Sequence, residues 1–159
     1  MLEAEANYGT SFLMFCGELF TVEALDTQPA WESIEILKKR YSNSLVTTLR
    51  RYVVASHKIP MAAFINTPHW QEKPDDQPNR WRYFVKSNKF VSQFGNIHPN
   101  LVLAQIDNNT YIKRGGPVGD YSLYLKDING NLHEFHAESF FNRYDILTLI
   151  VYIKQLNLR

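Results

Sequence analysis

The chain has 159 residues, 45% of them hydrophobic and 14% aromatic, which is enough apolar material for one good core or two small ones. Its 17 basic and 16 acidic residues nearly cancel, so the composition gives no overall attraction to nucleic acid or to an anionic membrane, and any such binding must be local. No segment approaches the roughly 20 apolar residues of a membrane-spanning helix, and the start lacks the basic-then-apolar order of a secretion signal.

Three helices are predicted before residue 57. The first opens the chain, where apolar residues recur at helical spacing, and Gly17 is its stop signal. Cys16 lies at its apolar end, so we expect a buried thiol, and a single cysteine is typical of a reducing compartment such as the cytoplasm. The second helix follows Pro29, and Asn43 or Ser44 caps the third. Their apolar faces comprise Trp31, Ile34, Leu37 and Tyr41, and then Leu45, Leu49, Tyr52 and Val53.

The densest basic cluster of the sequence falls on the second and third of these helices, as in a helix-turn-helix. Contacts from such a pair to nucleic-acid phosphates are physically reasonable. Lysine and arginine also cover the solvated faces of most surface helices, and we favour this second explanation. The cluster, a candidate site for nucleic acid or another partner, comprises Lys38, Lys39, Arg40, Arg50 and Arg51.

The segment TPHWQEKPDDQPNRW, residues 67–81, has three prolines and mixed charge, and it is expected to be a linker or long surface loop. It divides the helical part from a part rich in strands. RYFVKSN has strand-like spacing, and YSLYLKDINGNLHEFHAESF is typical of a hairpin whose turn includes Asn129 and Gly130, which tolerate positive φ. A last helix is predicted from near Asn142, with its apolar face formed by Ile146, Leu149, Ile150 and Ile153.

The predicted fold class is therefore α+β. A helical part of about three helices, residues 1–60, precedes a small antiparallel-sheet domain with a C-terminal helix, residues 61–159. These two parts form either two units or one lobed unit.

No complete catalytic motif is present, and the HExxH signature of zinc peptidases is absent from the sequence. His133 and His136 are the one close pair of histidines, but an odd separation on a strand places them on opposite faces, so they cannot share a metal. The glycine-rich segment at residues 112–120 lacks the spacing of a phosphate-binding loop and is better explained as a turn. An aromatic group lines either a small-molecule pocket or, as we favour, the core: Trp81, Tyr83, Phe84, Phe90 and Phe94.

The chain opens with EAEANYGTSFLMF, residues 3–15, and LKKRYSNSLVTTLRRYV comes later. These stretches resemble the segment that follows the HExxH helix in the ImmA/IrrE family of zinc metallopeptidases. The helix of that family has a glutamate, an alanine and an asparagine or aspartate ahead of an apolar run that ends near LLMP. Glu3, Ala6, Asn7 and the run FLMF take these places. The sequence departs from the pattern at Gly9, where phenylalanine is common, and at Phe15, where proline is usual. The resemblance covers residues 3 to about 58.

In that family two HExxH histidines and a carboxylate from this later helix hold the zinc. The resemblance therefore implies that Glu3 is a third zinc ligand in the full-length protein, and that Asn7, one helical turn later, contacts Glu3 from outside the ligand set. Glu5 is the alternative ligand if the motif is aligned two residues later. It also implies a regulatory protease that cuts a DNA-binding repressor. Without HExxH, this chain has neither the two nitrogen ligands nor the general base, and we expect it to be inactive as it stands.

Two explanations of the missing motif are open. Either the catalytic helix lies upstream of Met1 in the natural protein, or the chain is a natural relic that has lost this helix. We favour the first, because Glu3 lies so close to Met1.

Three hypotheses of function follow. The first is the non-catalytic C-terminal portion of such a peptidase, which contributes Glu3 and a substrate-docking or sensing domain. The second is a DNA-binding transcription regulator that uses the basic helices. The third is a small-ligand or protein-binding sensor formed by residues 80–159.

Overall fold

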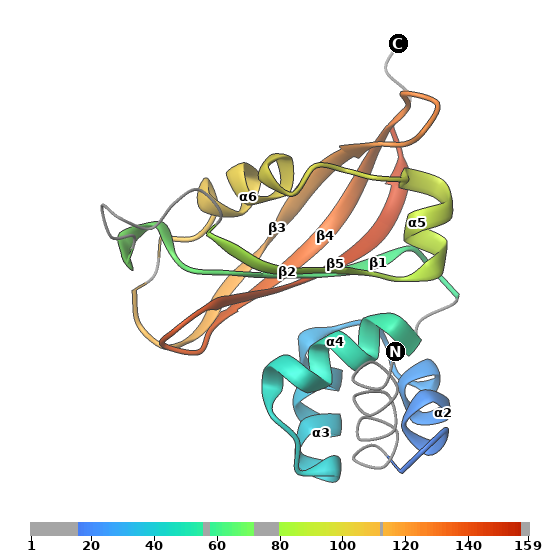
Figure 1. Ribbon diagram of the computed structural model, residues 1–159, viewed down its shortest axis with the longest axis vertical. Coiled ribbons are helices and arrows are strands. Elements are labelled where there is room, and N and C mark those ends of the chain that lie inside the picture. Colours follow the sequence, from blue (N-terminus) through green and yellow to red (C-terminus); the bar gives the residue numbers. More distant parts are fainter. Residues whose placement is uncertain (1–15, 56–57, 72–79, 112, 157–159) are drawn as a thin grey trace, which may run out of the picture.

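The computed structural model describes residues 16–55, 58–71, 80–111 and 113–156. They contain helices α2 to α4, then a five-stranded antiparallel sheet with two helices inserted between its second and third strands (Figure 1). The α+β class is confirmed, with helices first and strands after them. The predicted opening helix, including Glu3 and Asn7, lies outside the described residues.

Three helices lead into the sheet: α2 (Leu19–Asp26), α3 (Trp31–Tyr41) and α4 (Leu45–Ala55). The two predicted from residue 31 onward are present. Ser44 caps α4 as predicted, because its hydroxyl accepts the backbone N–H of Thr47 at 3.1 Å. Helix α2 was missed, because its apolar residues do not form one face: Leu19 is exposed while Phe20 is buried.

The sheet has the strand order β2-β1-β5-β4-β3, and every neighbouring pair is antiparallel. The proline-rich segment therefore connects two neighbouring strands of one sheet, and it does not separate the helical part from the strands. The strands are β1 (Met61–Asn66), β2 (Trp81–Lys86), β3 (Gly116–Lys126), β4 (Leu132–Phe141) and β5 (Ile146–Gln155).

The predicted C-terminal helix is wrong, because residues 146–155 form β5, the central strand of the sheet. Residues 146–151 are all buried, since helices cover both faces of the sheet at this strand. A strand buried on both faces has a continuous apolar run in place of alternation, and such a run also satisfies helical spacing. Asn142 is not a helix cap. Its side-chain oxygen accepts the backbone N–H groups of Tyr144 and Asp145 in the turn between β4 and β5.

Helices cover both faces of the sheet (Figure 1). Alternate residues of β1 point to opposite faces: Ala63 and Ile65 pack with α2, α3 and α4, whereas Ala62 and Phe64 pack under α5 (Asn88–Phe94) and α6 (Pro99–Asp107). Strand β5 divides its side chains in the same way. The helical part thus shares a hydrophobic core with the sheet, and Glu138 of β4 adds a polar link by accepting the N–H of Trp31 at 2.9 Å.

Three smaller predictions have mixed outcomes. Cys16 is exposed, so the prediction of a buried thiol is wrong. Residues 116–120 form the first part of β3 and not a turn before it, with an irregular register between Pro117 and Gly119. Most of the aromatic group is core as favoured, since Phe90 and Phe94 are buried; Trp81 and Phe84 pack against them, while Tyr83 is exposed.

The predicted hairpin is β3 and β4, joined at residues 127–131. His133 is 1% exposed and its ring lies 5.1 Å from that of Phe94, whereas His136 lies on the other face beside Trp31. The two histidines therefore point to opposite faces, as predicted. Asp127 holds the turn, because its carboxylate accepts the N–H groups of Asn129 and Asn131 and contacts His133 Nε2 at 3.1 Å.

Replacing Asp127 by asparagine is expected to remove a pH-dependent part of the stability. Burial by itself would raise the pKa of Asp127, but hydrogen bonds from Asn131, His133 and the Asn129 backbone outweigh it and lower the pKa from 3.8 to about 2. The ionised carboxylate therefore stabilises the fold fully above about pH 4, and this contribution disappears as the pH falls to about 2. Thermal unfolding should show a melting-temperature difference between the two proteins that shrinks over this interval. A difference that is constant with pH would contradict the assignment.

Candidate functional site

The residues proposed for metal binding, Glu3 and its partner Asn7, lie outside the described residues, as does the rival Glu5. Within residues 16–55, 58–71, 80–111 and 113–156, no group of three or more His, Cys, Asp or Glu side chains is placed to hold a metal ion. The site that the structure does describe is built from the basic cluster. The fold divides this cluster into a first set of three arginines, which contact other residues of the chain, and a second set of two lysines, which line a cleft.

Two arginines of the cluster are directed to helix α2. Arg40 Nη1 lies 2.9 Å from Glu23 Oε1, and Arg51 Nη2 donates to the Thr21 hydroxyl at 3.5 Å. These side chains therefore link α3 and α4 to α2 within the helical part. An ion pair between exposed side chains contributes little to stability, about 0–1 kcal/mol, but it does fix the direction of the guanidinium group.

Arg50 is directed to the sheet. Its guanidinium carbon lies 4.2 Å from the centre of the Tyr83 ring on β2, which is the geometry of a cation–π contact. Helix α4, which carries Arg50, buries Leu49, Tyr52 and Val53 in the core that it shares with the sheet. A recognition helix must enter the major groove, and here α4 lies against the sheet with one of its basic groups stacked on β2.

Lys38 and Lys39 form the second set, and they line a cleft of about 530 Å³ that we call the basic cleft. Its walls come from four places: the second half of α3, the first residue of α4, the two glycines at and just before the start of β3, and the end of β4 with the turn that follows. The lining includes Lys38, Lys39, Leu45, Gly115, Phe140 and Arg143. The two lysines are far from Arg143 in sequence, and the fold brings all three to one cleft.

Arg143 has an unusual backbone. Its φ is 78°, in the left-handed region that side chains other than glycine rarely adopt, and it follows Asn142 in the β4–β5 turn. Its side chain lies across Gly115, where an added methyl group would meet Arg143 Cγ at 3.0 Å. A residue with a side chain at position 115 would therefore displace Arg143. Arg143 was missed by sequence reasoning, because the turn that holds it was predicted to be the start of a helix.

The basic cleft has an excess of positive charge. Lys38, Lys39 and Arg143 form no ion pair with any residue in the described ranges. Glu35 is the one acidic side chain of the lining. Leu45 and Phe140 supply an apolar surface beside these charges, and the Phe140 ring is stacked on Trp31 at 5.4 Å between centroids with an interplanar angle of 13°.

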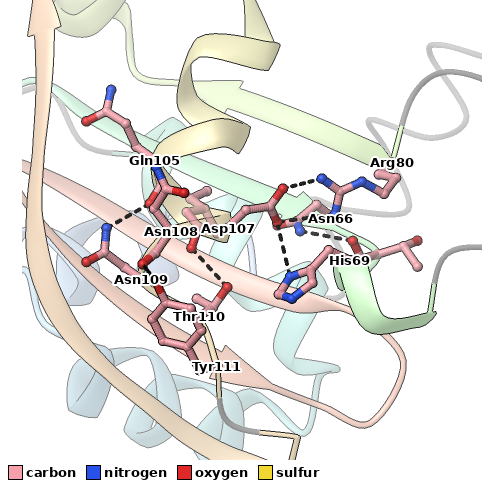
Figure 2. A network of polar contacts seen from close by, with 11 residues as sticks. Asn66, His69, Arg80, Gln105, Asp107, Asn108, Asn109, Thr110 and Tyr111 are labelled. Atoms are coloured by element: carbon pink, nitrogen blue, oxygen red, sulfur yellow. Dashed lines mark hydrogen bonds and ion pairs between the residues drawn. The ribbon is translucent and has the colours of Figure 1, made fainter.

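A second polar cluster lies at the far end of α6 (Figure 2). Asp107 accepts two hydrogen bonds from the Arg80 guanidinium and lies 3.8 Å from His69 Nδ1. Asn66, at the end of β1, is fully buried, and its amide donates to the Thr67 carbonyl. Its side-chain oxygen has no hydrogen-bond partner among the described residues. Asp107 thus contacts both ends of the β1–β2 connection, through His69 after β1 and through Arg80 before β2. We interpret this cluster as structural, because its contacts join the β1–β2 connection to α6.

Comparison of the sequence with profiles of known protein families gave no match, and comparison with curated proteins gave none either. None of the helices in the described ranges has the length and apolar character needed to cross a membrane.

Proposed function

We propose that the chain is the non-catalytic C-terminal portion of an ImmA/IrrE-like zinc metallopeptidase that regulates transcription by cleaving a DNA-binding repressor in the cytoplasm. In this proposal Glu3 is the third zinc ligand of the full-length protein and Asn7 is its second-shell partner. The residues after them form a module that docks the repressor or senses a ligand. The zinc-binding histidines of an HExxH helix, which these 159 residues do not contain, would be supplied by the full-length protein.

One observation carries the proposal beyond sequence resemblance. The segment LKKRYSNSLVTTLRRYV forms the end of α3 and nearly all of α4, and these helices bury their apolar faces against β1 and β5. Within the described residues, the part that resembles the family thus shares one hydrophobic core with the sheet. Such a sheet is suited to a regulatory role, because a change at its surface can reach the helices by direct packing.

At micromolar zinc concentrations the isolated chain is expected not to bind a stoichiometric amount of zinc, and it is expected not to hydrolyse peptides. One carboxylate is an incomplete site, since zinc in catalytic sites has three protein ligands. The measurement is equilibrium dialysis against zinc at about neutral pH. Glu3→Ala is the matched variant, and it should bind zinc as weakly as the unaltered chain does. Stoichiometric zinc that is lost in Glu3→Ala, or peptide hydrolysis by this chain, would contradict the proposal.

A second candidate function, small-ligand sensing, is favoured by a specific observation, which is the basic cleft. Its lining comes from the helical part and from the sheet, so an occupant would contact both. Ligand sensing is compatible with the peptidase proposal, because a ligand bound in the cleft would contact α3 and α4, which follow the catalytic part in the full-length protein of that proposal. The DNA-binding hypothesis has weaker support, since Arg40, Arg50 and Arg51 are engaged within the chain.

A further inference from the structure

We propose that the basic cleft binds a small phosphate-bearing ligand about the size of a nucleoside monophosphate. Lys38, Lys39 and Arg143 would hold the phosphate, and the body of the ligand would lie on Leu45 and Phe140. The inference rests on the second candidate function, small-ligand sensing, and deepens it by naming the ligand class. It does not depend on membership of a peptidase family, because it concerns binding by this chain alone.

The charge of the cleft selects the chemical class. A phosphate monoester carries about −1.5 to −2 at pH 7, whereas a carboxylate carries a single charge. Three cations face one carboxylate in the lining, so a dianion neutralises the cleft and a monoanion does not. Arginine offers a planar fork of donors that fits two phosphate oxygens, and lysines add mobile point charges on either side.

The size and the apolar wall limit the ligand further. Cavities that bind small molecules usually enclose about 300–1,000 Å³, and the basic cleft, at about 530 Å³, falls within this range. Phe140 is held by its stacking on Trp31, so its position does not depend on a ligand. A ring or other apolar group attached to the phosphate can therefore gain contact area there, which a bare phosphate ion cannot.

The strain at Arg143 separates this inference from a purely structural explanation. Lysines in the last turn of α3 are favourable at a helix C-terminus, and this alone accounts for Lys38 and Lys39. It does not account for Arg143, which comes from the β4–β5 turn and has a φ of 78°. Its side chain lies across Gly115 and faces the same cleft without an ion pair in the described residues. Strained residues of this kind cluster at binding sites, where the surrounding structure maintains them.

Isothermal titration of the full chain at constant ionic strength tests the inference, with adenosine monophosphate, inorganic phosphate and acetate as probes. Adenosine monophosphate should bind saturably, inorganic phosphate should compete with it at higher concentration, and acetate should do neither. Lys38→Ala, Lys39→Ala and Arg143→Gly should each weaken adenosine monophosphate binding about tenfold or more, because each removes a charge-assisted hydrogen bond. Arg143→Gly should keep its fold, since glycine adopts a positive φ freely.

Lys126→Ala is the control, because it removes the same charge at the opposite end of β3, and its affinity should stay within about twofold of the unaltered chain. The inference is overturned if neither phosphate-bearing probe binds saturably, or if Arg143→Gly and the two lysine variants bind as the unaltered chain does.

Discussion

Replacing Phe135 by alanine is expected to lower the free energy of unfolding by about 3–5 kcal/mol. Phe135 is fully buried on β4, and its ring centroid lies 5.7 Å from that of Phe90, 5.0 Å from that of Phe94 and 5.6 Å from that of Tyr152. Truncation removes the central member of this aromatic group and leaves a cavity between the sheet and α5. For a chain of this length the melting temperature should fall by about 6–20 °C.

Urea unfolding followed by circular dichroism measures this change. Tyr124→Ala is the matched control, because Tyr124 is an aromatic residue of the same hairpin but is 45% exposed, and its substitution should cost no more than about 0.5 kcal/mol. Equal and small effects of the two substitutions would show that the aromatic group does not form the core under α5 and α6.

Replacing Leu149 by alanine is expected to cost about 2–5 kcal/mol and to leave a single unfolding transition. Leu149 is fully buried on β5, in the core that the sheet shares with α2, α3 and α4. Because residues from both parts form this core, loss of packing there should destabilise the helices and the sheet together. The prediction therefore tests whether residues 1–60 and 61–159 behave as independent units.

Helix and sheet can be followed separately during heating by circular dichroism near 222 nm and by the infrared amide band. Both signals should give one midpoint, shifted equally by Leu149→Ala. Ile153→Ala is the control on the same strand, since Ile153 is 46% exposed and its loss should be close to neutral. Two separate transitions, with one unchanged in the Leu149 variant, would establish independent units.

Local sequence signals predicted the elements that depend on local chemistry. Helix α4 has a serine cap and a one-sided apolar pattern, and the β3–β4 hairpin has alternation on each side of a turn with Asn129 and Gly130. The central strand β5 could not be predicted in this way, because its burial on both faces depends on helices far away in the sequence. Helices α5 and α6 were missed because both are short.

The candidate site was predictable only in part. Lys38 and Lys39 were found because charge clusters are visible in sequence, and Arg40 was grouped with them although it is directed to Glu23. Which charges face a common cleft depends on tertiary packing. Arg143 reaches the cleft through a turn that exists only because β5 is a strand, so the error in secondary structure also concealed this residue.

The mass and metal content of the natural protein test the central claim most directly. An antibody raised against this chain would isolate the protein from its source, and intact mass spectrometry and elemental analysis would follow. The account predicts a protein longer than these 159 residues, with HExxH ahead of Glu3 and about one zinc ion per chain. A natural protein of 159 residues without zinc would contradict it.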